Sequence, residues 1–126
     1  MDFNASLSGL SAFSTAQQVT AHNVANVNTE EFQSSRVSLE ELPDQGGVRV
    51  QEISKNTDPG PMVQSMRLEQ TQAGQTRQVQ ATVQASNTDV AREMVSMTVN
   101  ENAFAANAAV VRTQDEMLGH VVDEMV

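Results

Sequence analysis

The chain has 126 residues, of which 16 are acidic and 7 are basic, giving a formal net charge of -9 and a pI near 4.4. This surplus of acid argues against nucleic acids and anionic membrane surfaces as partners, because both are bound through basic side chains. Aromatic residues make up only 3% and cysteine is absent, so small residues and methionines must pack the single expected domain, and disulfides and thiolate metal sites are excluded.

The first predicted element is a helix that begins near Phe3 and fades at Asn26. No Asp, Glu, Lys or Arg occurs from Phe3 to Thr29, yet the Ser, Asn, Gln and Thr content is too polar for a membrane span. Such a helix is suited to being surrounded by other protein. The Asn-rich stretch that follows favours a turn, after which Phe32 is placed to fold back.

The middle of the chain, residues 34–85, is expected to be a mixed and variable region. Pro43 to Gly47 and Asp58 to Pro61 are its clearest turn signals. The alternation that begins at Val48, together with the shared apolar parity beyond the second turn, predicts a small β-hairpin. The glutamine-rich stretch 64–84 is interpreted as a solvated connection rather than a binding tract.

The last predicted element is a long helix preceded by a capping signal. In the segment Ser86 to Asp89, a Ser or Asn oxygen can accept from free amide groups, while Asp89 complements the positive end of the helix dipole. From Val90 to Met125, apolar residues recur at steps of four and three, and only two acidic residues interrupt them. This spacing is typical of a coiled-coil seam.

These elements predict a mainly α fold, in which long N- and C-terminal helices pack as a coiled-coil-like pair beside a short variable middle. The expected segments are residues 1–33, 34–85 and 86–126. The second helix would extend roughly 57 Å and the first roughly 38 Å, so part of the longer seam lacks an internal partner. Another subunit is the economical explanation, and fraying beyond Gly119 is the alternative.

Two separated motifs resemble the bacterial flagellar rod and hook proteins. The first comprises Leu7 to Ala12 and Val19 to Phe32, and contains Val-Thr-Ala-His-Asn-Val-Ala-Asn-Val-Asn-Thr. The second comprises residues 87–95, 104–107 and 113–118, and the chain most resembles the proximal-rod members. The resemblance implies a structural subunit of the flagellar basal-body rod, which assembles through its terminal helices into a helical axial tube. It also implies a place in the periplasm-spanning rod and export without a cleaved signal peptide.

The resemblance assigns both helices to contacts between subunits. Small residues would permit close approach of helices, methionines would fill irregular gaps, and Asn23 and Asn26 would satisfy backbone groups where the first helix ends. The expected interface residues are Leu7, Leu10, Val19, Asn23, Val24, Asn26, Phe32, Val90, Met94, Met97, Phe104, Asn107, Val111 and Leu118. The implied partners are further copies of the chain, other rod and hook-basal-body proteins and the flagellar export apparatus, with no nucleic acid and no direct membrane insertion.

Catalytic, metal and cofactor sites are not expected. His120 lies at helical spacings from Asp123 and Glu124, but one histidine with two carboxylates is usually a solvated face. The sequence contains no glycine-rich phosphate loop and no recognisable nucleophile motif. We therefore predict that the chain is not an enzyme. The alternative function is a soluble coiled-coil adaptor or chaperone-like interaction module, which would form a small closed oligomer.

Overall fold

The computed structural model describes residues 3–44 and 46–126; Met1, Asp2 and Gln45, which fall within the expected segments 1–33 and 34–85, lie outside this description. The elements follow one another along the chain as α1 (Phe3–Ala25), β1 (Ser35–Glu41), β2 (Val48–Lys55), β3 (Met62–Gln70), β4 (Thr76–Gln84) and α2 (Val90–Met125). Both terminal helices therefore form close to where the sequence predicts them.

The predicted fold class is wrong, because the middle of the chain is built from four antiparallel strands. Helix accounts for 48% and strand for 27% of the protein, which is not a mainly coiled-coil helical architecture. The strands form two separate ribbons, β1–β2 and β3–β4. The single expected hairpin is also wrong, since the strand that begins at Val48 pairs backwards with β1 and the strand that begins at Met62 pairs forwards with β4.

Each ribbon is closed by a turn in which glycine supplies a positive φ. Gly46 and Gly47 have φ of 64° and 107° between β1 and β2, and Gly74 has φ of 78° between β3 and β4. The glutamine-rich stretch interpreted as a solvated connection contains the second turn. There the Thr71 amide donates to the Gln75 carbonyl at 2.8 Å, and the Gln75 amide donates to the Thr71 hydroxyl at 3.2 Å.

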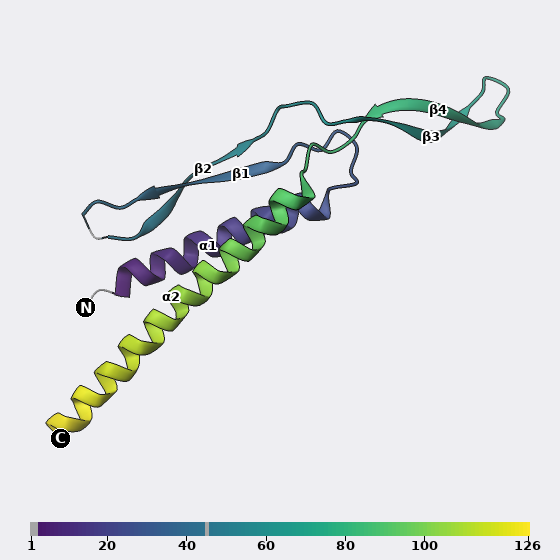
Figure 1. Cartoon of the computed structure of the whole chain (residues 1–126). Helices are drawn as coiled ribbons and strands as arrows, with labels where there is room; N and C mark the ends of the chain where they lie inside the picture. The colour runs from purple at the N-terminus through teal and green to yellow at the C-terminus, as the bar shows by residue number, and fades with distance from the viewer. Residues whose placement is uncertain (1–2, 45) are drawn as a thin grey trace.

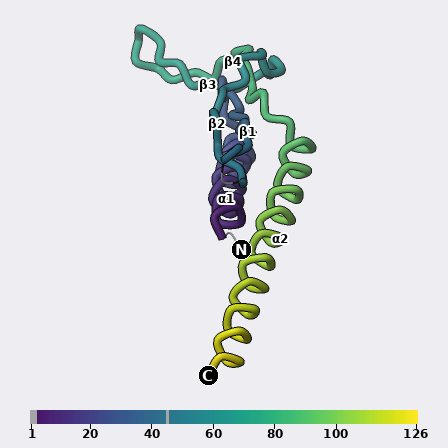
Figure 2. Tube along the Cα trace, turned by 90° about the vertical axis from the view of Figure 1, so that its left-hand side faces the viewer, coloured from purple at the N-terminus to yellow at the C-terminus, as the bar shows by residue number. Residues whose placement is uncertain are grey.

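Helix α1 lies between the β1–β2 ribbon on one side and α2 on the other (Figures 1 and 2). Helix α2 runs antiparallel to α1 and continues well past its N-terminal end. The β3–β4 ribbon projects from the opposite end of the molecule. Within the described residues, this ribbon contacts neither helix and neither strand of the other ribbon.

A junction of hydrogen bonds to two asparagine side chains joins the helices to the ribbons. Asn23, only 1% exposed, donates to the Ser35 carbonyl at 2.7 Å and accepts from the Ser35 amide at 2.8 Å. Asn87 accepts from the Ser34 amide at 2.7 Å and donates to the Asn56 and Asp58 carbonyls, each at 2.8 Å. The backbone groups of Ser34 and Ser35 are thus held from α1 and from the segment just before α2, because buried amides need partners.

The junction also changes the expected capping roles. Asp89 is itself the N-cap of α2, and its carboxylate accepts from the Arg92 amide at 3.3 Å, whereas Ser86 and Asn87 bond elsewhere. At the end of α1, Asn26 donates to the His22 carbonyl at 2.9 Å, as a capping residue would. Asn23 instead holds strand β1.

The protein buries little apolar surface. Its solvent-accessible area is 9109 Å², whereas a compact monomer of 13.6 kDa would expose about 6,600 Å². Among the described residues, the only buried hydrophobic side chains are those of Ala12 and Ala16. A chain with so small a core leaves most of its large apolar side chains available to other molecules.

Candidate subunit interface

The contact between α1 and α2 is made mainly by small and polar residues. Along α1, the buried positions recur at helical spacing and comprise Ser6, Gly9, Ala12, Ala16, Thr20 and Asn23. A Cβ atom at Gly9 would lie 2.8 Å from Oδ1 of Asn107, so the absence of a side chain lets the two helices approach closely. Asn107, anchored by donating to the Ala103 carbonyl at 2.8 Å, therefore packs within its own chain.

The face of α2 that meets the rest of the chain is also polar. Glu93 is buried there, and the half-buried side chains that continue this face include Ser96, Asn100, Asn107, Val111 and Gln114. The Oε1 atoms of Gln17 and Gln114 are buried without a hydrogen-bond partner among the described residues. Apolar burial on α2 is thus limited to half-buried side chains such as Met97, Ala103 and Val111.

Most of the large apolar side chains of α2 instead lie on the flanks of its contact with α1, where they stay partly or largely exposed. Given the helical repeat of 3.6 residues, they form two stripes, one on each flank of that contact. The seam stripe contains Val90, Met94, Met97, Phe104, Ala108 and Val122. The opposite stripe contains Val95, Val99, Val110, Met117 and Val121. Met94 is 61% exposed on the first stripe and Val95 is 64% exposed on the second.

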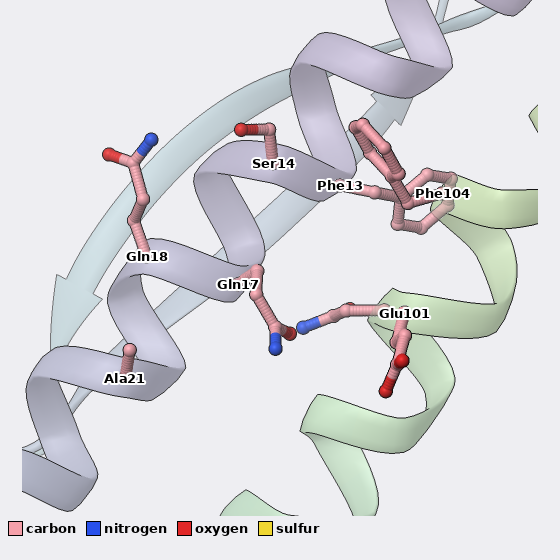
Figure 3. A pocket seen from close by; sticks show the side chains of 8 residues that line it. Phe13, Ser14, Gln17, Gln18, Ala21, Glu101 and Phe104 are labelled. Atoms are coloured by element: carbon pink, nitrogen blue, oxygen red, sulfur yellow. The ribbon is translucent and has the colours of Figure 1, made fainter. Parts of the chain in front are cut away.

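A groove of about 370 Å³ lies between the two helices on the side of the seam stripe. Phe13 from α1 and Phe104 from α2 stand together at one end of it, and Gln17 points toward α2 (Figure 3). Ala21 and Glu101 contribute to the remaining walls. The walls are largely apolar, which suits an apolar side chain from another molecule.

Comparison with protein families assigns both ends of the chain. Residues 3–33 match the family described as "Flagella basal body rod protein", and residues 79–124 match the family described as "Flagellar basal body rod FlgEFG protein C-terminal". The chain belongs to the flagellar basal-body rod family. Rod-family domains are structural, so the chain is a structural rod protein of the flagellar basal body. No individual curated protein matches the chain.

The structure distributes the expected interface residues of this rod protein over three environments. The exposed ones are Leu7, Val90, Met94, Phe104 and Leu118. The half-buried ones are Leu10, Val19, Val24, Asn26, Phe32, Met97, Asn107 and Val111, and Asn23 is buried. Phe32 folds back as expected and meets His22 edge-on, with ring centroids 5.5 Å apart. Contact of these residues with neighbouring subunits stays a prediction.

Sequence reasoning did not identify two surface features of the rod protein, although it noted the shared apolar parity on which the first depends. One face of the β3–β4 ribbon carries Met62, Met66 and Leu68 and no charged residue, because their cross-strand partners are Gln84, Gln80 and Gln78. The other feature, the basic pocket, is a hollow of about 380 Å³ lined by Arg36, Ser54, Lys55, Asn56, Asp58 and Arg92. Its cations are far apart in sequence, and only the pairing of β1 with β2 beside the start of α2 brings them together.

The described part of the chain offers no metal centre and no membrane helix. It contains no group of three His, Asp or Glu side chains that could hold a metal ion. His120 and Glu124 lie 3.9 Å apart on the exposed surface of α2 and have no third ligand. Neither described helix combines the length and hydropathy that a membrane crossing needs.

Proposed function

We propose that this rod protein is an axial subunit that assembles, through both terminal helices, with further copies and other rod or hook-basal-body proteins into a helical tube. The observation that carries the proposal is the distribution of apolar and polar side chains around α2, which is the reverse of that expected for a helix of a globular core. Its internal contact is small and polar, while its large apolar residues lie exposed on both flanks. Exposed apolar surface of this extent marks an interaction site.

The two stripes fit an assembly that continues in one direction. A head-to-tail contact needs two different surfaces on each copy, and it generates a helical filament when successive rotations do not close into a ring. The seam stripe and the opposite stripe are such a pair of surfaces. A closed dimer would need only one of them.

The overhang of α2 supports the same proposal. With 36 residues, α2 spans about 54 Å, whereas the 23 residues of α1 span about 35 Å. Gly9 packs against Asn107, so the last turns of α2 extend beyond the start of α1. Leu118 and Val122 are 50% and 58% exposed there. A helix end of this kind gains most of its stability from tertiary packing, which a neighbouring subunit would supply.

Export through the flagellum-specific apparatus, to a position in the periplasm-spanning rod, is part of the proposal. It rests on membership of the rod family. A soluble adaptor would behave differently, as a small closed oligomer that is absent from purified basal bodies.

The test is to place a charge on the seam stripe. Met94→Asp should leave the helicity of the isolated chain nearly unchanged, because Met94 is 61% exposed, but should abolish incorporation into basal bodies by burying an unpaired charge between subunits. Gln72→Asp, at the exposed tip of the β3–β4 ribbon, makes the same charge change and should be incorporated normally. Immunoblots of purified basal bodies and swimming assays measure both. Normal incorporation of the Met94→Asp chain would contradict the proposal.

A further inference from the structure

The basic residues of this acidic chain fall into two groups. Four of the seven form ion pairs with carboxylates at 2.7 to 3.8 Å; they are Arg49, Arg67, Arg77 and Arg112. The remaining three, Arg36, Lys55 and Arg92, have no carboxylate within 4.0 Å among residues 3–44 and 46–126. All three line the basic pocket.

The pocket gathers these cations from three elements. Arg36 comes from the start of β1, Lys55 from the last position of β2, and Arg92 from the first turn of α2. In the ribbon Arg36 pairs with Ser54 and Lys55 pairs with Ser35, so the first two lie at diagonal positions at the same end of the ribbon, where both line the pocket. Asp58 is the only carboxylate in the lining, so the pocket keeps a positive balance.

The opposite end of α2 has the complementary charge. Its last turns carry Asp115, Glu116, Asp123 and Glu124 against a single arginine, Arg112. Arg112 is already bonded to Glu116 at 3.0 Å, and no basic residue follows it apart from His120. The negative end of the helix dipole lies at the same place, with nothing cationic in the last turn to offset it.

The two charged ends cannot meet within one molecule. Arg92 and Asp123 are separated by about 46 Å of continuous helix at 1.5 Å per residue. Figure 1 shows the C-terminal end of α2 far from the point where α2 leaves the ribbons. The basic pocket and the acidic end of α2 can therefore contact one another only between molecules.

We propose that the basic pocket of one copy receives the acidic last turns of α2 from a second copy. The contact is head to tail, because pocket and acidic end lie at opposite ends of the same helix, and so it repeats along an axis. This inference rests on the proposed axial assembly. It adds the contact that sets the direction and the axial spacing of successive copies. In a chain with a net charge of -9, copies repel one another in general, and the pocket is where approach of an acidic segment is favourable.

The test exchanges the charges of the two surfaces. The pocket variant carries Lys55→Glu and Arg92→Glu, and the tail variant carries Asp123→Lys and Glu124→Lys. The substitutions at Arg92, Asp123 and Glu124 favour the α2 dipole, so both variants should keep the helix. Each variant alone should self-associate at least about tenfold more weakly than the native chain in sedimentation velocity at low salt. An equimolar mixture should recover association to within about threefold, because each altered surface then finds its complement.

The control variant carries Arg49→Glu and Arg77→Glu. It has the same net charge as the pocket variant, but its changes lie at basic residues that are already paired on the two ribbons. It should associate like the native chain. Because the native chain has no cysteine, Ser54→Cys in one copy and Asp123→Cys in another should form an intermolecular disulfide in assembled basal bodies. The pair Ser54→Cys with Thr98→Cys should not.

The outcomes separate this inference from the proposed function. A pocket variant that associates like the native chain, or a mixture that stays dissociated, would overturn the head-to-tail contact. If Met94→Asp still blocks incorporation while the pocket and tail variants enter basal bodies normally, the contact is refuted and the axial assembly stands. A native chain that neither associates nor enters basal bodies would refute both.

Discussion

Helices α1 and α2 form one antiparallel pair, but they differ in how much of their surface the rest of the chain covers. Helix α1 is covered on two sides, by the β1–β2 ribbon and by α2, and its buried face consists of small or polar residues. Helix α2 contacts only α1 among the described elements, and exposes residues such as Met94 and Val95. Close approach of backbones thus holds the chain together, while large apolar side chains remain for other molecules. The following variants test that division from the largest expected effect to the smallest.

The largest expected effect is at the junction. Asn23→Ala should lower the free energy of unfolding by about 3 kcal/mol, because both backbone groups of Ser35 lose their partner in a site that is nearly closed to water. Urea unfolding followed by circular dichroism measures the change. Asn28→Ala, at an exposed turn position, is the control and should change stability by less than about 0.5 kcal/mol. Equal stability of the two variants would show that the junction does not hold α1.

The close approach of the helices can be broken at Gly9. Gly9→Val should cost about 2 kcal/mol, because the added side chain would overlap the Asn107 side chain and force the helices apart. The same substitution at Gly119, where nothing lies within 4 Å of the added Cβ, should be neutral or slightly stabilising, since valine has the higher helix propensity. Thermal unfolding of the two variants measures the difference. If the Gly9→Val chain were as stable as the Gly119→Val chain, close approach of the helices at Gly9 would not be needed for stability.

Phe104 tests how little an exposed apolar residue contributes within one chain. It is 43% exposed and meets Phe13 only at the edge of the groove, so Phe104→Ala should cost about 1.5 kcal/mol, well below the roughly 3 to 5 kcal/mol of a fully buried phenylalanine. Val99→Ala, on the opposite stripe, should cost less still. Urea unfolding of the monomeric chain is the measurement. A loss above about 3 kcal/mol would mean that the seam stripe belongs to the core of the chain.

The smallest effect concerns the ion pair that ties the β3–β4 ribbon to the turn after α1. Hydrogen bonds from Ser65 and from Arg67, the latter at 2.7 Å, hold the pKa of Glu30 below its ordinary value. Because the folded-state pKa is depressed, the stabilisation is present above the unfolded pKa near 4.5 and is lost as pH falls through the folded value. The protection of the ribbon amides, measured as their exchange rate relative to that of the unfolded chain at the same pH, should therefore fall below that pH. Glu30→Gln should remove this pH dependence, and an unchanged profile would count against the tie.

The sequence predicts the helices well because their signals are local. The absence of charge up to Thr29, the Asn-rich turn and the capping residue Asp89 mark ends that depend on neighbouring residues alone. The apolar period of α2 is real as well. Periodicity cannot tell whether the partner is in the same chain, because packing within and between molecules requires the same spacing. Only the structure shows that the seam stripe lies on one flank of the contact with α1, where Met94 is 61% exposed.

The ribbons and the basic pocket depend on pairings between distant residues. Strand β4 alternates Val79, Ala81 and Val83 with polar residues, but its glutamines favour a solvated interpretation when they are read alone. In an isolated two-stranded ribbon both faces meet water, so polar residues are tolerated on each. Asn23 and Asn87 show the same limit. Asparagine is typical of turns, but Asn23 binds the backbone of β1, and Asn87 binds backbone groups just outside β1 and β2.

The junction has a mechanical consequence for the helix pair. Asn23 and Asn87 fasten α1 and α2 at one end, where the ribbons leave, and no described strand contacts α2 elsewhere to clamp the two helices together again. The two helices are therefore joined by hydrogen bonds at one end, and elsewhere they contact each other mainly through small side chains. Separating the helices requires the least work near the start of α1 and the most at the junction. The β1–β2 turn also holds the start of α1, since the Val48 amide donates to the Ser8 hydroxyl at 3.2 Å, so spreading moves α2 against α1 and the β1–β2 ribbon together.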